Sequence, residues 1–249
     1  MNEEKFNGKE KIYASARPSY PNTLFEYLKN NNIICSDTSV ADVGAGTGIF
    51  TRQISEYAKR VYAVEPNDGM REQGIKNTAS LKNVKFINGT AESTGIKSGS
   101  VDIVTVVQAF HWFDRAAFKK ECKRILSPGG KVVLVWNNRD ESAEIIAKNF
   151  EVNKLYCKNF RGSSNGMNFD KDGFNDFFDG EPKVAEFKNN LEYDMSEFIG
   201  RSLSSSYAPK EGEPNYQGYV EALKSVFLGC SAGEKAEYPY ITKCFIGKV

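Results

Sequence analysis

The sequence predicts an α/β fold built on a mainly parallel sheet, and three observations support this. Val40–Val43 reads as a short apolar strand that leads into glycines at alternate positions, Gly44, Gly46 and Gly48. Segments with strand character alternate with segments of helical periodicity along the first half of the chain, which is typical of parallel sheets. Val101–Val107 is a nearly continuous β-branched run, as expected for a strand that is buried on both faces.

The predicted elements follow one another in a regular order. A first helix is expected over 23–31, because Leu24, Tyr27 and Leu28 share one helical face. Parallel strands are expected at Val40–Val43, Arg60–Val64, Val84–Ile87, Val101–Val107 and Lys131–Trp136. The helices between them are expected over 47–59, 68–76 and 115–126, with a turn at Pro128-Gly129-Gly130.

The second half of the chain has a different character. A helix is expected over 141–158, and residues 159–182, rich in Asn, Gly, Asp and Phe, read as a long loop or a small cap. Its phenylalanines are more simply read as the core of that cap than as a lid over a site. Two late strands are expected at 183–187 and 240–246, with helices at 196–203 and 219–228 between them.

The spacing of the glycines indicates which nucleotide the loop binds. A dinucleotide-binding loop needs its third glycine three positions after the second, and Ile49 occupies that position. Asp42 would oppose an anionic pyrophosphate next to the loop. The same acid favours S-adenosylmethionine, which carries a sulfonium and an ammonium group. Glu65 ends the next strand and suits the two ribose hydroxyls, because a carboxylate accepts two O–H donors.

These motifs carry a family resemblance. Asp42-x-Gly44-x-Gly46-x-Gly48, followed by Val64-Glu65-Pro66-Asn67, resembles the class I S-adenosylmethionine-dependent methyltransferases. Three further segments resemble the small-molecule, methyltransferase type 11-like subfamily that includes trans-aconitate methyltransferase: Tyr13 with Arg17–Pro21, Ala109–Asp114 and Leu126–Lys131. The resemblance implies a doubly wound, Rossmann-like, mostly parallel sheet of seven strands, whose late strands lie antiparallel at one edge.

The same resemblance implies a domain organisation. Residues 1–249 are expected to form a single methyltransferase domain. Within it, residues 1–31 would be an N-terminal arm and helix over the site, and residues 32–140 the cofactor-binding core. Residues 159–239 would contribute the cap and other insertions on the substrate side.

The resemblance also implies contacts around the adenosine. Pro66, Asn67 and Met70 would border it, although Met70 is equally well read as helix core. The family commonly has an Asp at the position of Thr90, where it accepts from the adenine amino group. Here either the Thr90 hydroxyl or Glu92 would have that role, and the amide of Ala91 would meet the adenine ring.

Gln108, directly after the fourth strand, is expected to contact the cofactor. The acceptor side is expected at the following His111 and Trp112 and in the N-terminal arm. His111 is the single histidine of the chain and lies beside Trp112. It is read first as a wall of the site or an acceptor ligand and second as a general base. Tyr13, Arg17 and Tyr20 would form the opposite wall, where the Arg17 guanidinium could clamp a carboxylate. The acceptor is expected to be a small molecule, with a carboxylic acid as the first candidate.

Composition narrows the remaining possibilities. A net charge of +1 predicts neither a nucleic-acid nor a membrane partner. Five cysteines without a C-x-x-C pair argue against a disulfide framework and against a metal site, so a cytoplasmic protein is expected. A monomer or homodimer is expected. Two alternatives stay open. One is an S-adenosylmethionine-binding module without turnover, acting as a sensor or partner subunit. The other is a nicotinamide-dependent oxidoreductase, against which Ile49 and Asp42 both count.

Overall fold

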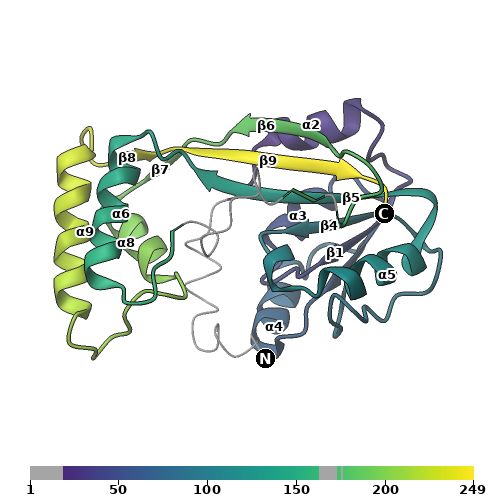
Figure 1. Ribbon diagram of the computed structural model, residues 1–249, viewed down its shortest axis with the longest axis horizontal. Coiled ribbons are helices and arrows are strands. Elements are labelled where there is room, and N and C mark those ends of the chain that lie inside the picture. The colour runs from purple at the N-terminus through teal and green to yellow at the C-terminus, as the bar shows by residue number, and fades with distance from the viewer. Residues whose placement is uncertain (1–18, 163–172, 175) are drawn as a thin grey trace.

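A seven-stranded sheet forms the centre of the computed structural model, which describes residues 19–162, 173–174 and 176–249 (Figure 1). The strands lie in the order β3-β2-β1-β4-β5-β9-β6. Their bounds are β1 Ser39–Val43, β2 Arg60–Val64, β3 Val84–Ile87, β4 Val101–Val107, β5 Leu126–Arg139, β6 Lys183–Lys188 and β9 Tyr240–Gly247. β1 to β5 pair in parallel, whereas β9 runs antiparallel to both β5 and β6. The predicted mostly parallel, seven-stranded fold is therefore confirmed.

Helices cover both faces of this sheet. On one face α2 (Asn22–Asn30) and α3 (Ile49–Ile54) pack over Val133 and Val135 of β5 and their neighbours. On the other face α5 (Arg115–Ile125) packs over Val132 and Leu134. This division follows from the alternation of side chains along a strand. A further helix, α4 (Asp68–Asn77), lies between β2 and β3 in the chain.

β5 departs most from its predicted bounds. Residues 128–130, where the sequence predicts a turn, form an irregular start of the strand, and the register with β4 shifts there. At its other end β5 continues to Arg139, because β9 pairs with it as far as Tyr240. The last residue of β4, Val107, pairs with Val135. β5 and β9 therefore project together beyond the C-terminal end of β4.

The projecting strands lead to a second group of helices. α6 (Glu144–Tyr156), α8 (Met195–Leu203) and α9 (Tyr216–Cys230) share a hydrophobic cluster with the short paired strands β7 (Leu191–Tyr193) and β8 (Ala236–Tyr238). Figure 1 shows this group, here called the cap, at the far end of β5 and β9. None of these helices, nor any other in the described ranges, is long and apolar enough to span a bilayer.

Three phenylalanines of the late loop have a different place from the predicted one. Phe174, Phe177 and Phe178 are buried in the sheet core beneath α5, so the prediction that they form the core of a cap is wrong. Their rings pack against aromatic side chains from distant segments, such as Phe118 of α5 against Phe177, and local sequence does not reveal such contacts. Phe160 does pack in the cap cluster. Phe169 lies outside the described residues.

Candidate cofactor and acceptor site

The glycine loop after β1 depends on backbone conformations that side chains disfavour. Gly44 and Gly48 have φ of +75° and +79°, in the left-handed region, and Gly48 is the N-cap residue of α3. A Cβ atom added at Gly44 would lie 2.6 Å from Cβ of Ala109. A Cβ atom added at Gly46 would have no neighbour within 4 Å among the described residues. The loop is therefore tightly packed at its start and open at its centre.

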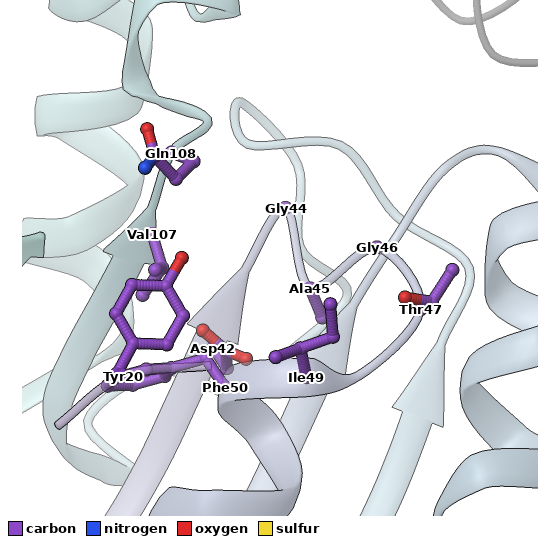
Figure 2. A pocket seen from close by; sticks show the side chains of 10 residues that line it. All are labelled: Tyr20, Asp42, Gly44, Ala45, Gly46, Thr47, Ile49, Phe50, Val107 and Gln108. Atoms are coloured by element: carbon purple, nitrogen blue, oxygen red, sulfur yellow. The ribbon is translucent and has the colours of Figure 1, made fainter. Parts of the chain in front are cut away.

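A pocket opens above this loop (Figure 2). It lies between the C-terminal ends of β1 and β4, where the strand order reverses and folds of this type bind ligands. Its lining consists of Tyr20, Asp42, Gly44, Ala45, Gly46, Thr47, Ile49, Phe50, Val107 and Gln108. Four predicted cofactor residues thus meet there, and Tyr20 of the predicted acceptor wall joins them.

Asp42 forms part of the pocket while remaining almost fully buried. Its two carboxylate oxygens accept hydrogen bonds from the hydroxyls of Thr51, at 2.6 Å, and Thr105, at 2.8 Å. Burial raises the pKa of Asp42 to about 6, although the two hydrogen bonds act in the opposite direction. At neutral pH the carboxylate is therefore mostly ionised and presents negative charge to the pocket.

Glu65, at the end of β2, holds the glycine loop in place. One carboxylate oxygen accepts from the amide of Gly46 and the other from the amide of Asn67, both at 2.9 Å. Burial raises the pKa of Glu65, opposed by these two hydrogen bonds. A carboxylate has further lone pairs, so Glu65 can accept two more O–H donors without giving up either contact.

The side of the pocket beyond β4 is built around Gln108. Its φ of +59° is unusual for a residue other than glycine. Its backbone amide donates to the carbonyl of Val135, and its side-chain Nε2 donates to the carbonyl of Asn137 at 3.2 Å. Asn137 in turn donates through Nδ2 to the carbonyl of Ser19. These contacts place the segment before Tyr20 beside the end of β4.

Residues predicted to border the adenosine have local contacts outside the pocket lining. Asn67 is the N-cap of α4, where its Oδ1 accepts from the amide of Met70 at 2.9 Å. The Met70 side chain is buried. The carbonyl of Pro66 accepts from Arg71 Nη1 at 3.2 Å. Their contacts with an adenosine stay predictions.

The residues predicted to recognise adenine also lie apart from this lining. The Thr90 hydroxyl accepts from the amide of Ser93, and Glu92 is exposed and accepts through Oε1 from the amide of Asp114, before α5. Ala91 is buried in the sheet core. Neither the Thr90 hydroxyl nor Glu92 is singled out by these contacts as the adenine acceptor.

The predicted acceptor side is only partly described. His111 and Trp112 lie in the 3-10 turn η2 (Phe110–Trp112), with ring centroids 4.6 Å apart. Neither lines the pocket, and within the described residues His111 Nδ1 is buried without a hydrogen-bond partner. Burial lowers the pKa of His111 to about 4, so its imidazole is neutral at physiological pH. Tyr13 and Arg17 lie outside the residues that the structure describes.

One polar residue of the pocket was not predicted. Thr47 lies between the second and third glycines, and its hydroxyl is buried with no hydrogen-bond partner in the described part of the chain. Its position inside the glycine motif is the signal that could have identified it. In the same described ranges, no cluster of three or more His, Cys, Asp or Glu side chains could hold a metal ion.

Comparison with known proteins agrees with this geometry. A family model described as a methyltransferase domain matches residues 41–134. The uncharacterized methyltransferase Rv3342 of Mycobacterium tuberculosis is 40% identical over 129 residues, which are 52% of this chain and 50% of that protein. The uncharacterized methyltransferase-like protein C25B8.10 of Schizosaccharomyces pombe is 35% identical over 147 residues, covering 59% and 56%. The chain therefore spans about half the length of the relatives it matches.

The fold is shared more widely than the sequence. A solved structure from Anaeromyxobacter dehalogenans, assigned as a type II methyltransferase, has a TM-score of 0.69 at 22% identity, covering 93% of this chain and 97% of that one. At this identity the likeness concerns the fold alone. Residues 41–134 thus match a methyltransferase domain, and the sheet that contains them has the fold of solved methyltransferase structures.

Proposed function

We propose that the chain binds S-adenosylmethionine in the pocket above the glycine loop and transfers its methyl group to a small-molecule acceptor. The observation that carries this proposal is the ionised, buried Asp42 in a pocket whose loop is held by Glu65. When bound, S-adenosylmethionine supplies a methyl group on a positively charged sulfur.

Polar groups in the pocket lining, together with Glu65 behind the glycine loop, fit this ligand. Asp42 offers negative charge to a cationic group, and Glu65 has lone pairs left for ribose hydroxyls. The Thr47 hydroxyl, which has no hydrogen-bond partner among the described residues, is available to a polar group of the ligand, such as its carboxylate. The open space over Gly46 allows close approach to the backbone.

We infer that a carboxylic acid is the first candidate for the acceptor. Methyl transfer mainly needs alignment and exclusion of water, and a carboxylate is already a nucleophile without a base. Tyr20 and Gln108, on the side of the pocket away from Thr47, would contact the acceptor (Figure 2). His111, neutral at physiological pH, would be a wall of the acceptor site, and could take a proton only from an amine or phenol.

Binding and turnover are tested separately. The full chain is titrated calorimetrically with S-adenosylhomocysteine and with NADH, and only the first is expected to bind. Absence of S-adenosylhomocysteine binding would refute the proposal, and binding of NADH instead would favour the oxidoreductase alternative. Labelled S-adenosylmethionine is then incubated with a panel of small acids, amines and phenols. Binding without transfer to any compound would favour a module without turnover.

A further inference from the structure

Two arginines lie close together in the cap, and no acid in the described part of the chain pairs with either. Arg201 lies on α8 and is only 5% exposed, and Arg139, the last residue of β5, is half-buried. Within the described ranges neither forms an ion pair with an Asp or Glu side chain. Buried charges are normally paired, because removing them from water is costly.

Tyrosines surround both guanidinium groups. Arg201 Nε donates to the hydroxyl of Tyr240 at 2.5 Å, and its guanidinium carbon lies 4.2 Å from the ring centroid of Tyr238. Arg139 Nη2 donates to the hydroxyl of Tyr207 over a long 3.4 Å. Among the described residues each guanidinium donates only that one hydrogen bond, so several N–H donors on each are left for another acceptor.

Arg139 is the cross-strand partner of Tyr240, whose hydroxyl accepts from Arg201, so the two positive charges lie beside the same tyrosine. Burial alone would raise the pKa of Tyr207, but Arg139 and Arg201 both lower it, and the net shift is downward. Stacking on aromatic rings offsets part of the cost of burying an arginine. It leaves the N–H donors unsatisfied and does nothing to relieve the repulsion between two like charges. An anion between the two guanidinium groups would accept hydrogen bonds from these N–H donors and would relieve the repulsion.

The position of this pair relates it to the pocket. Arg139 lies on the same face of β5 as Asn137, whose carbonyl accepts from the pocket residue Gln108. It also lies four residues beyond Val135, the partner of the last residue of β4. At the rise of a strand, this places the Arg139 backbone roughly 13 Å past the end of β4.

We propose that Arg139 and Arg201 bind an oxyanion at the far end of the methyl acceptor. This inference rests on the proposed methyltransferase function and narrows its substrate class. The acceptor would be an elongated molecule with a carboxylate or phosphate on the order of 10 Å from the atom that receives the methyl group. Guanidinium groups recognise such oxyanions through paired hydrogen bonds, so the same pair would select the length and the charge of the acceptor.

The test measures binding of defined oxyanions to the full chain. Calorimetric titrations use hexanoate, adipate, suberate and hexyl phosphate, together with the corresponding neutral amides, in the presence and absence of S-adenosylhomocysteine. The proteins are the wild type, Arg139→Lys and Arg201→Lys, which keep the charge but lose the planar fork. The control is Arg60→Lys, since Arg60 is exposed but also donates to a tyrosine hydroxyl, that of Tyr62 at 3.0 Å.

The expected result is binding of at least one acid to the wild type, with its amide weaker by about tenfold or more. Arg139→Lys and Arg201→Lys should each lower the affinity for that acid by about tenfold, and Arg60→Lys should leave it unchanged. Comparison of the carboxylates with hexyl phosphate identifies the preferred oxyanion. Equal binding of acids and amides, unchanged binding by both arginine variants, or no binding of any oxyanion would overturn the inference.

The two proposals can fail independently. S-adenosylhomocysteine affinity is measured in every variant and is expected to stay at the wild-type value, which also shows that the variants are folded. If the wild type does not bind S-adenosylhomocysteine, the proposed function is refuted. The titrations without S-adenosylhomocysteine would still decide whether the arginine pair binds an oxyanion.

Discussion

The carboxylate of Glu65 accepts a hydrogen bond from the backbone amide of Gly46 at 2.9 Å. This contact joins the end of β2 to the glycine loop after β1. Its other oxygen holds the amide of Asn67, the N-cap of α4. Two residues predicted to contact the same cofactor are thus already in contact with each other, so the acid shapes the loop as well as offering itself to a ligand.

Glu65→Gln should therefore weaken the binding of S-adenosylhomocysteine by about tenfold or more, because a charged acceptor of several hydrogen bonds is lost. It should also speed amide hydrogen exchange at Gly46. Calorimetry and exchange measured by NMR check the two effects. Glu72→Gln, an exposed acid on α4, is the matched control and should change neither. Unaltered affinity in Glu65→Gln would contradict the assigned role.

The glycine loop predicts unequal costs for two similar substitutions. Gly46→Ala should lower the free energy of unfolding by about 1 kcal/mol, because its φ of +56° is unfavourable for alanine but its Cβ meets open space. Gly44→Ala should cost at least about 1 kcal/mol more, since its Cβ would also collide with Ala109. Urea denaturation measures both, and equal losses would show that the collision is relieved without cost.

Asp42 makes stability depend on pH in a defined direction. Its folded pKa of about 6 lies above the ordinary 3.8, so the folded state binds the proton more tightly than the unfolded state. The wild type should therefore lose stability as pH rises from about 4 to above 6. Asp42→Asn removes this loss and should be more stable at pH 8, by up to about 3 kcal/mol, but not at pH 4. A stability difference independent of pH would contradict this.

The same substitution should reduce function. Without the negative charge, affinity for S-adenosylmethionine should fall more than affinity for S-adenosylhomocysteine, because only the former carries the sulfonium charge. In the wild type, affinity for S-adenosylmethionine should also fall below pH 6, as Asp42 becomes protonated. Parallel calorimetric titrations of both compounds measure these affinities. An equal loss of affinity for the two compounds would show that Asp42 does not interact with the sulfonium charge.

Glu121 on α5 should give the opposite pH dependence. Hydrogen bonds from Arg124 hold the pKa of Glu121 at about 2, below the ordinary 4.5, helped by Thr94 and opposed by burial. Its contribution is complete above pH 4.5 and is lost as pH falls toward 2. Glu121→Gln should lower the free energy of unfolding by about 2 kcal/mol at pH 7 and by little near pH 2. Glu151→Gln, which breaks the exposed pair with Lys154 at the same spacing, should cost under about 0.5 kcal/mol.

His111 is simple to test because the chain has one histidine. Its imidazole signals in NMR should titrate with a pKa of about 4, since burial disfavours the charged form. With a carboxylate acceptor, His111→Gln should raise the acceptor KM severalfold and leave kcat nearly unchanged. A drop in kcat with unchanged KM would instead assign His111 as the general base. Titration near 6.5 would show that its environment is open to water.

The strands and the glycine loop could be predicted because their signals are local. β1, β2 and β4 are short apolar runs, and Gly44 and Gly48 occupy conformations that few other residues accept. Polar residues beside the site were harder to interpret. Asn67 caps α4 and Glu92 accepts from the backbone before α5, and in the sequence such capping acids and amides look the same as ligand contacts.

Sequence by itself determined the fold class, the position of the glycine loop and the acid Glu65 at the end of the next strand, because strand period, glycine spacing and strand-end acids act over a few residues. Only the tertiary structure decided how far β5 extends, where Phe174 packs, and that Arg139 and Arg201, from a strand and a distant helix, lie beside the same tyrosine with no acid of the described ranges paired to either. Those outcomes depend on burial and charge contributed by segments far apart in the chain, which no local pattern records.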